Sequence, residues 1–305
     1  MRSGAGTVRT RSPQLVVHVR LVIVVAVLAG GLALARPRAS SAHPAPSLPR
    51  SRPLPPVGVE WERSGLLGVL ACPAGMAWVN SPSASFCVDR YEASLLRMGP
   101  GGETQHWPGN RIVDGLEGDM MAVSRPGIKP QGYISGRQAS VACASAGKRL
   151  CSLQEWTLAC RGPHDTRYPY GKQRRAGACN DRFRGTADHP VLRLFQAQAA
   201  PGADPRSMWL PSWMNDPRLL ELPHTVAPSG ASNDCTNEYG VFDMVGNLHE
   251  WVADPDGVFA GGYFMDTLQN GEGCEYRTRA HGFDYHDYST GFRCCVDAPS
   301  ADLVR

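Results

Sequence analysis

The sequence predicts an α+β domain with short strands and long loops, and three observations support this fold class. Two helices are indicated at 136–146 and 153–160, whereas the strand-like runs are short and do not alternate with helices as in a βαβ fold. Glycine and proline supply 33 and 25 of the 305 residues, which indicates many turns. The segment 183–223 shows little periodicity and is expected to be irregular.

Local signals limit the expected elements. The first helix is preceded by Ser135 and followed by Gly147, a residue type that commonly ends a helix in the left-handed conformation. Strands are expected at 76–79, 86–88 and 258–264, which are apolar runs bounded by turn residues.

The second helix begins at a capping box, in which the side chains of Ser152 and Glu155 each accept a backbone N–H of the other residue. It is expected to end at Gly162. Trp156 and Cys160 lie four residues apart and therefore share one face, which should pack against the core.

Charge sets the first 58 residues apart from the domain predicted at 59–305. They contain eight arginines (+8) and no acidic residue, so the rest of the chain carries −5 although the total is +3. A mildly acidic domain argues against nucleic-acid binding, which requires a basic surface.

Residues 1–35 are predicted to be a signal peptide. Arginines precede an apolar run at 21–35, which is shorter than the roughly 20 residues of a membrane span. Cleavage is expected after Ala35 or Ala42, and an uncleaved signal anchor is the alternative. The following residues, 36–58, are rich in proline and arginine and predict an extended linker.

The ten cysteines are even in number and all follow residue 70, which predicts a disulfide-stabilised domain in an oxidising compartment. The protein is therefore expected to be secreted, or periplasmic within the cell envelope. Membrane contact is expected only if the N-terminal segment stays uncleaved.

Short motifs follow one another between residues 70 and 296. They are CPAGM at 72–76, FCVDRYE at 86–92, AGKRL at 146–150, EW at 155–156, ACRG at 159–162, YPYG at 168–171, YGVFDMVGNLHEW at 239–251, GG at 261–262 and GFR at 291–293. In this order they resemble the formylglycine-generating enzyme, or sulfatase-modifying factor, domain family. The resemblance implies a compact, loop-rich fold that is distantly similar to C-type lectins.

This family also includes ergothioneine sulfoxide synthases and a pyoverdine-maturation protein, so the resemblance alone does not determine one reaction. Its sulfatase-activating members bind copper through two cysteine thiolates after the Gly-Gly pair. Here those positions hold Asp266 and Gly271, and Tyr263 replaces a serine. The resemblance therefore implies a degenerate active-site region, with Cys274 as a structural cysteine close to Arg277, and copper is not expected.

Disulfides are the expected role of the cysteines. Three bridges are expected, the last two from the resemblance: Cys72–Cys87, Cys143–Cys294 and Cys160–Cys274. The remaining four cysteines allow three pairings, which the sequence leaves open: Cys151, Cys179, Cys235 and Cys295.

The segment 243–250 resembles a calcium-binding loop of the family. Calcium accepts carboxylate and carbonyl oxygens in flexible loops. The implied ligands are the Asp243 side chain, the Gly246 and Leu248 carbonyls and the Glu250 carboxylate. A second calcium site would use Asn180 and Asp181. The alternative for the segment is a tight turn with exposed acidic side chains.

A further polar group lies in the loop 280–288. His281, Asp284, His286 and Asp287 include the two histidines and a carboxylate found in some metal sites. The loop composition favours solvated side chains instead.

Two function classes remain from the sequence. The first is an exported, non-catalytic binding or accessory module whose partner is another exported protein, a peptide or a glycan. The alternative is an oxidoreductase of the same family that assists maturation of another exported protein.

Overall fold

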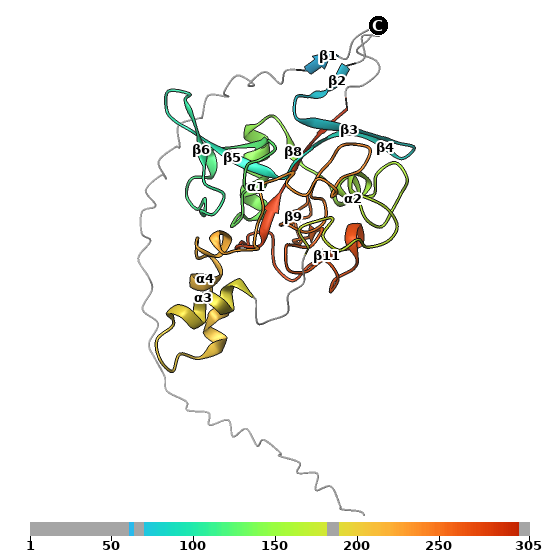
Figure 1. The fold of residues 1–305 in the computed structure, drawn as a ribbon. Helices are drawn as coiled ribbons and strands as arrows, with labels where there is room; N and C mark the ends of the chain where they lie inside the picture. Colours follow the sequence, from blue (N-terminus) through green and yellow to red (C-terminus); the bar gives the residue numbers. More distant parts are fainter. Residues whose placement is uncertain (1–60, 64–69, 182–188, 299–305) are drawn as a thin grey trace, which may run out of the picture. The chain divides into compact units, whose positions relative to one another are not determined.

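The computed structural model describes residues 61–63, 70–181 and 189–298 (Figure 1). The signal peptide and linker predicted at 1–58 lie outside these residues. Within the described ranges, no helix combines the length and the apolar character that a bilayer span requires.

The described strands form four small sheets. A two-stranded sheet pairs β1 (Trp61–Arg63) with β2 (Leu70–Pro73). The second sheet has the order β3 (Met76–Ser81), β4 (Ala84–Asp89), β13 (Cys294–Asp297) and β8 (Arg149–Leu150). The third is β6 (Thr104–Trp107), β5 (Ala93–Met98) and β7 (Met120–Ser124). The fourth is β11 (Arg277–Thr278), β10 (Phe259–Ala260), β9 (His249–Trp251) and β12 (Thr290–Phe292).

The two expected helices are present as α1 (Gly136–Ser145) and α2 (Leu153–Arg161). Both begin at a complete capping box, formed by Ser135 with Gln138 and by Ser152 with Glu155. Two backbone donors at each N-terminus are thereby satisfied by side chains. The α+β fold class is thus confirmed, with short strands, loops and two well-capped helices.

The strand expected at 258–264 is mostly wrong, because only Phe259–Ala260 pairs as a strand. Gly261 and Gly262 follow with φ values of 83° and 72°, which turn the chain out of the sheet. A Cβ on Gly261 would lie 2.6 Å from the Met244 carbonyl oxygen, so the turn also requires glycine for space.

The expectation of an irregular segment at 183–223 is wrong in its described part, from residue 189 onward. It contains α3 (Pro190–Gln198) and α4 (Pro211–Met214), which Figure 1 shows grouped together, and the 3-10 turns Pro205–Trp209 and Leu219–Glu221. The buried residues of α3 include Val191, Leu194 and Phe195, a three- and four-residue spacing that could have identified the helix. Pro190 at its first position was a second signal.

Five disulfides connect the described elements and use all ten cysteines of the chain. Three of them match the expected pairs: Cys72–Cys87, Cys143–Cys294 and Cys160–Cys274. The pairs left open are Cys151–Cys295 and Cys179–Cys235. Cys294 and Cys295 begin β13, so two bridges hold this C-terminal strand to α1 and to the residue that follows β8.

Candidate functional site

The loop after Gly262 is where the resemblance places the copper cysteines. Here Asp266 folds back onto its own loop, and its Oδ1 accepts hydrogen bonds from the backbone N–H groups of Leu268 (2.9 Å) and Gln269 (3.1 Å). Its Oδ2 accepts one from the Tyr276 hydroxyl at 3.1 Å. Asp266 is only 8% exposed, so its carboxylate acts as an internal cap.

The second cysteine position, Gly271, is a glycine for backbone reasons. Its φ is 110°, and a Cβ there would lie 2.5 Å from the Glu275 carbonyl oxygen. Any cysteine at this position would therefore displace the backbone.

The nearby thiol is also unavailable. Cys274 lies in the 3-10 turn Gly273–Glu275 and is bonded to Cys160 of α2, with Sγ atoms 2.03 Å apart. Because every cysteine of the chain is in a disulfide, none can act as a thiolate ligand in this state. The residues present do not fit the two-sulfur coordination that monovalent copper prefers.

Aromatic side chains occupy the space around this loop. The buried imidazole of His249 has its ring centroid 4.8 Å from that of Tyr263, 4.5 Å from that of Phe259 and 5.6 Å from that of Tyr276. Its Nε2 lies 3.3 Å from the Tyr276 hydroxyl, and its Nδ1 lies 3.3 Å from the Ser289 hydroxyl.

Burial, with a smaller contribution from the charge of His281, lowers the pKa of His249 to about 3, so its ring is neutral at physiological pH. Burial also raises the pKa of Tyr263 to about 12. Neither His249 nor Tyr276 was predicted as a residue of this site. His249 lies within the motif at 239–251, whereas Tyr276 lies in none of the motifs.

Arg277, the remaining residue of the expected active-site region, does not join this cluster. Its side chain is exposed and lines a surface groove with Leu153 and Leu158 of α2. Of the four expected residues, the structure joins only Tyr263 and Asp266, through two backbone hydrogen bonds of 2.9 and 3.0 Å.

The comparisons with known proteins agree with the motifs. The family described as "Sulfatase-modifying factor enzyme 1-like domain" matches residues 105–298, more than half of the chain. The chain belongs to this family. Two curated relatives carry the name "Inactive C-alpha-formylglycine-generating enzyme 2". The one from Bos taurus is 26% identical over 180 residues (55% of this chain, 50% of the relative), and the one from Mus musculus is 25% identical over 187 residues (57% and 52%). The chain thus spans about half the length of the curated relatives it matches.

Solved structures were also found at low identity. PvdO from Pseudomonas aeruginosa is 14% identical with a TM-score of 0.41, covering 70% of this chain and 80% of that one. CarF is 14% identical with a TM-score of 0.37, covering 70% and 87%.

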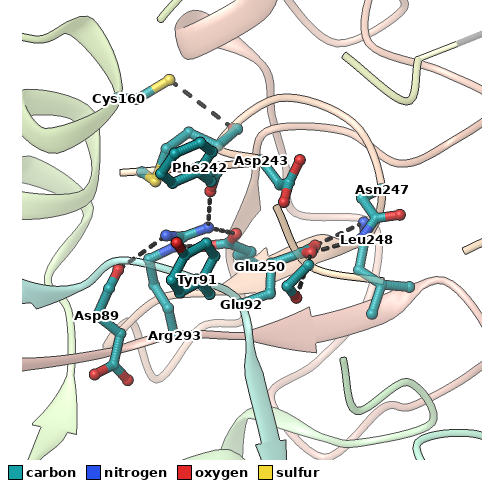
Figure 2. A network of polar contacts seen from close by, with 12 residues as sticks. Asp89, Tyr91, Glu92, Cys160, Phe242, Asp243, Asn247, Leu248, Glu250 and Arg293 are labelled. Atoms are coloured by element: carbon teal, nitrogen blue, oxygen red, sulfur yellow. Dashed lines mark hydrogen bonds and ion pairs between the residues drawn. The ribbon is translucent and has the colours of Figure 1, made fainter. Parts of the chain in front are cut away.

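A buried charged network lies beside the same family motifs (Figure 2). Arg293 is fully buried and forms a bidentate ion pair with Glu250. Its Nη2 donates to Oε1 and its Nε donates to Oε2, each at 2.6 Å. The guanidinium also donates to the backbone carbonyls of Asp89 (3.0 Å) and Phe242 (2.9 Å). The indole Nε1 of Trp156 donates to Glu250 at 2.7 Å.

Two more buried carboxylates complete this network. Glu92 accepts hydrogen bonds from the Asn247 side chain and from the backbone N–H of Leu248 (3.1 Å), while Asp243 accepts one from the backbone N–H of Gly230 (2.6 Å). Burial, followed by the charges of Asp243 and Glu250, raises the pKa of Glu92 well above its usual value. Burial raises the pKa of Asp243 to about 6.

These contacts bear on the first calcium site of the resemblance. Both Glu250 oxygens face hydrogen-bond donors, of which one is a guanidinium, so the expected closing ligand already has a cation beside it. Asp243 is buried, which excludes the alternative of exposed acidic side chains in a turn. The arrangement does not fit a calcium site that uses all four expected ligands.

The second expected site shows the same feature. The Asp181 carbonyl accepts from Arg174 Nη2 at 3.2 Å, and its carboxylate is paired with the same guanidinium at 2.9 Å. The Asn180 amide donates to the Thr225 carbonyl and to Asn247 Oδ1, each at 2.9 Å. Within the described ranges, no three or more His, Cys, Asp or Glu side chains converge on a common metal position.

The polar group at 280–288 is dispersed among separate partners. Asp284 pairs with Arg137, His286 lies 2.8 Å from Asn215 Oδ1, and the His281 ring stacks on Tyr285. The expectation of solvated side chains is wrong for Asp287. It is buried and accepts from the Tyr285 hydroxyl at 2.7 Å and from the Ser289 backbone N–H at 2.7 Å, because it closes the turn that leads into β12.

Proposed function

We propose that this protein is an exported, non-catalytic member of the sulfatase-modifying factor family that acts as a binding or accessory module. The observation that carries the proposal is the state of the cysteines. All ten form disulfides, and the two copper-ligand positions hold a buried capping aspartate and a glycine required by the backbone.

Two further observations support the loss of oxidase chemistry. Tyr263 packs against His249, so a large ring lies where the resemblance places a serine. The curated relatives are themselves named as inactive formylglycine-generating enzymes, and the match covers about half of the length of each.

Export is supported by the disulfides. Five bridges in one domain are typical of proteins that fold in an oxidising compartment. Mass spectrometry of the exported chain should find a first residue of Arg36 or His43 and no free thiol. An intact Met1 together with free thiols would contradict the assignment.

Calcium binding by the 243–250 loop stays a prediction. Asp243 and the carbonyls of Gly246 and Leu248 are the remaining donors, since Glu250 is held by Arg293. A thermal melt in calcium chloride and in EDTA is the direct measurement. A rise in Tm with calcium that Asp243→Ala abolishes would establish the site, and superimposable melts would remove it.

Catalysis is tested by a peptide-oxidation assay. The purified protein is incubated with copper, a reductant and a cysteine-containing sulfatase-type peptide, and formylglycine is detected by mass. A known active family member serves as the positive control. We expect no turnover, because no thiolate pair is available to bind copper and engage the substrate thiol.

Turnover by the unmodified protein, persisting in a Cys274→Ser variant, would show that another site carries the chemistry. The oxidoreductase function, assisting maturation of another exported protein, would then replace the proposal.

A further inference from the structure

A surface cleft of about 490 Å³ lies between three segments that are distant in the sequence. They are the loop after β6, the segment that contains α4, and the loop before β12. The volume falls within the range of about 300–1,000 Å³ that is usual for small-ligand sites. The residues that line the cleft include none from the Asp266 loop and none from the family motifs.

One wall of the cleft is an exposed aromatic ring. Trp209 is 50% exposed, although its ring is held edge-to-face against His189 with centroids 5.0 Å apart. Ile112, which is 43% exposed, contributes apolar surface from the loop after β6. A fixed, half-exposed tryptophan offers a flat apolar face to a ligand at a low entropic cost.

The remaining lining supplies hydrogen-bonding groups of both kinds. Asp114 and Asp284 provide acceptors, and Ser212 provides a hydroxyl. His286 Nδ1 lies 2.8 Å from Asn215 Oδ1, a contact that uses the amide oxygen and not the amide nitrogen, which is a donor.

The two carboxylates of the cleft are both held in place by the protein. Asp284 pairs with Arg137 through two hydrogen bonds. Asp114 accepts from the neutral Gln138 amide at 2.8 Å, and it lies 3.3 Å from His286 Nε2, a contact that is an ion pair only when the histidine is protonated. The cleft therefore offers fixed carboxylate acceptors beside an amide donor, a hydroxyl and an apolar ring, which suits a ligand that both donates and accepts hydrogen bonds and has one apolar face.

Pyranose sugars have this chemistry, because their hydroxyl groups donate and accept while the C–H groups of one ring face are apolar. We infer that the cleft between Trp209, Asp114 and Asn215 is a binding site for neutral oligosaccharides. The inference rests on the proposed function as a binding module and names the class of its ligand.

The cleft is rigidly built, which supports a preformed site. The Tyr133 hydroxyl donates to the Asp216 carbonyl at 2.6 Å, and the Tyr288 backbone N–H donates to the Met214 carbonyl at 3.1 Å. The Phe195 and Trp213 rings pack edge-to-face between α3 and α4, with centroids 5.1 Å apart. These contacts attach the α4 segment to the core, so little ordering is required on binding.

The test is a binding panel with the full chain, read by calorimetry and by ligand-observed NMR. Cellotriose and maltotriose represent polysaccharides, while mannotriose and tri-N-acetylchitotriose represent glycoprotein glycans. A tri-arginine peptide and a sulfated disaccharide are the charged comparisons. We expect saturable binding of at least one neutral trisaccharide with a Kd of about 1 mM or lower. The trisaccharides that bind show whether the ligand comes from a polysaccharide or from a glycoprotein glycan.

Variants assign the binding to the cleft. Trp209→Ala should weaken it at least tenfold, whereas Trp209→Phe should retain part of it. Trp78→Ala is the matched control, because Trp78 is 52% exposed but lies on β3, outside the cleft.

Three results would overturn the inference: binding of a charged probe only, no binding of any trisaccharide by the folded protein, or equal binding by the Trp209→Ala variant. The peptide-oxidation assay on the same preparation keeps the proposals apart. Turnover would refute the non-catalytic function and leave the cleft proposal intact, while the absence of sugar binding by the unmodified protein would refute only the cleft proposal.

Discussion

The Arg293 network and the Asp266 loop both lie on motifs of the same family, yet their polar groups are used differently. In the network, residues from three distant motifs meet. Glu92, Glu250 and Arg293 come from the motifs at 86–92, 239–251 and 291–293 and are buried together (Figure 2). In the Asp266 loop, the polar groups are used locally, since Asp266 accepts two backbone N–H groups from residues two and three positions later.

The difference separates the structural part of the family pattern from its catalytic part. The network residues support each other across the core, so a change in one leaves others buried without a partner. The Asp266 loop needs no thiol to fold, because the Asp266 carboxylate accepts the backbone N–H groups of Leu268 and Gln269.

The largest loss of stability is expected on removal of the Cys160–Cys274 disulfide, which joins α2 to the turn that follows the Asp266 loop. Replacing Cys160 and Cys274 together by serine opens a 114-residue separation, for which chain entropy predicts a loss of about 4–5 kcal/mol. The matched control replaces Cys72 and Cys87, whose separation is 15 residues and whose predicted loss is about 3 kcal/mol. Urea unfolding measures both. Equal losses would show that loop length does not determine the contribution of these bridges.

Breaking the network is expected to cost slightly less. Arg293→Met leaves Glu250 buried without its cation, and removing one partner of a buried pair costs about 3–5 kcal/mol. Arg206→Met is the control, since its ion pair with Asp204 is exposed to solvent and should contribute little to stability. Similar midpoints for Arg293→Met and the unmodified protein would mean that the network is not structural.

The buried His249 in the aromatic cluster beside the Asp266 loop should make the stability of the protein depend on pH. His249 is neutral in the folded protein down to about pH 3, whereas an unfolded histidine takes up a proton near pH 6.5. Its contribution to stability is therefore complete above about pH 7 and is lost as the pH falls. Between pH 7.5 and pH 5, the unmodified protein should lose about 2 kcal/mol relative to His249→Phe. Unfolding curves of the two proteins that shift in parallel with pH would exclude a buried neutral His249.

The smallest effect is expected in the loop itself. Asp266→Ala removes the acceptor for the Leu268 and Gln269 backbone N–H groups and should cost about 1–2 kcal/mol. Asp266→Asn keeps a side-chain oxygen and should cost less. Thermal melts compare the three proteins. If the asparagine variant were the less stable of the two, the carboxylate would have a role beyond capping.

Several features were predictable because their causes are local. The helix α1 that ends before the left-handed Gly147 (φ 69°) and the helix α2 that begins at the capping box of Ser152 and Glu155 depend on residues within a few positions of each other. The helix at 190–198 had such a signal in Val191, Leu194 and Phe195, which the sequence analysis did not use. The strand expected at 258–264 failed because apolar composition does not show where a glycine pair turns the chain.

The candidate site was predictable only in outline. The sequence placed Tyr263 and Asp266 in one loop, but it assigned Glu250 to calcium and left Arg293 as part of a motif. Their ion pair joins residues 43 positions apart, and nothing local to either residue indicates it.

The sequence by itself determined the family, the fold class, the two capped helices and the absence of cysteines at positions 266 and 271. All of these follow from residue identity at fixed spacing. Only the tertiary structure decided that Arg293 forms an ion pair with Glu250, that Cys151 pairs with Cys295, and that Trp209 and Asp114 line the same cleft. The physical reason is that burial and partner choice depend on which distant segments the fold brings within a few ångströms, and the free energy of a buried charge depends on that partner.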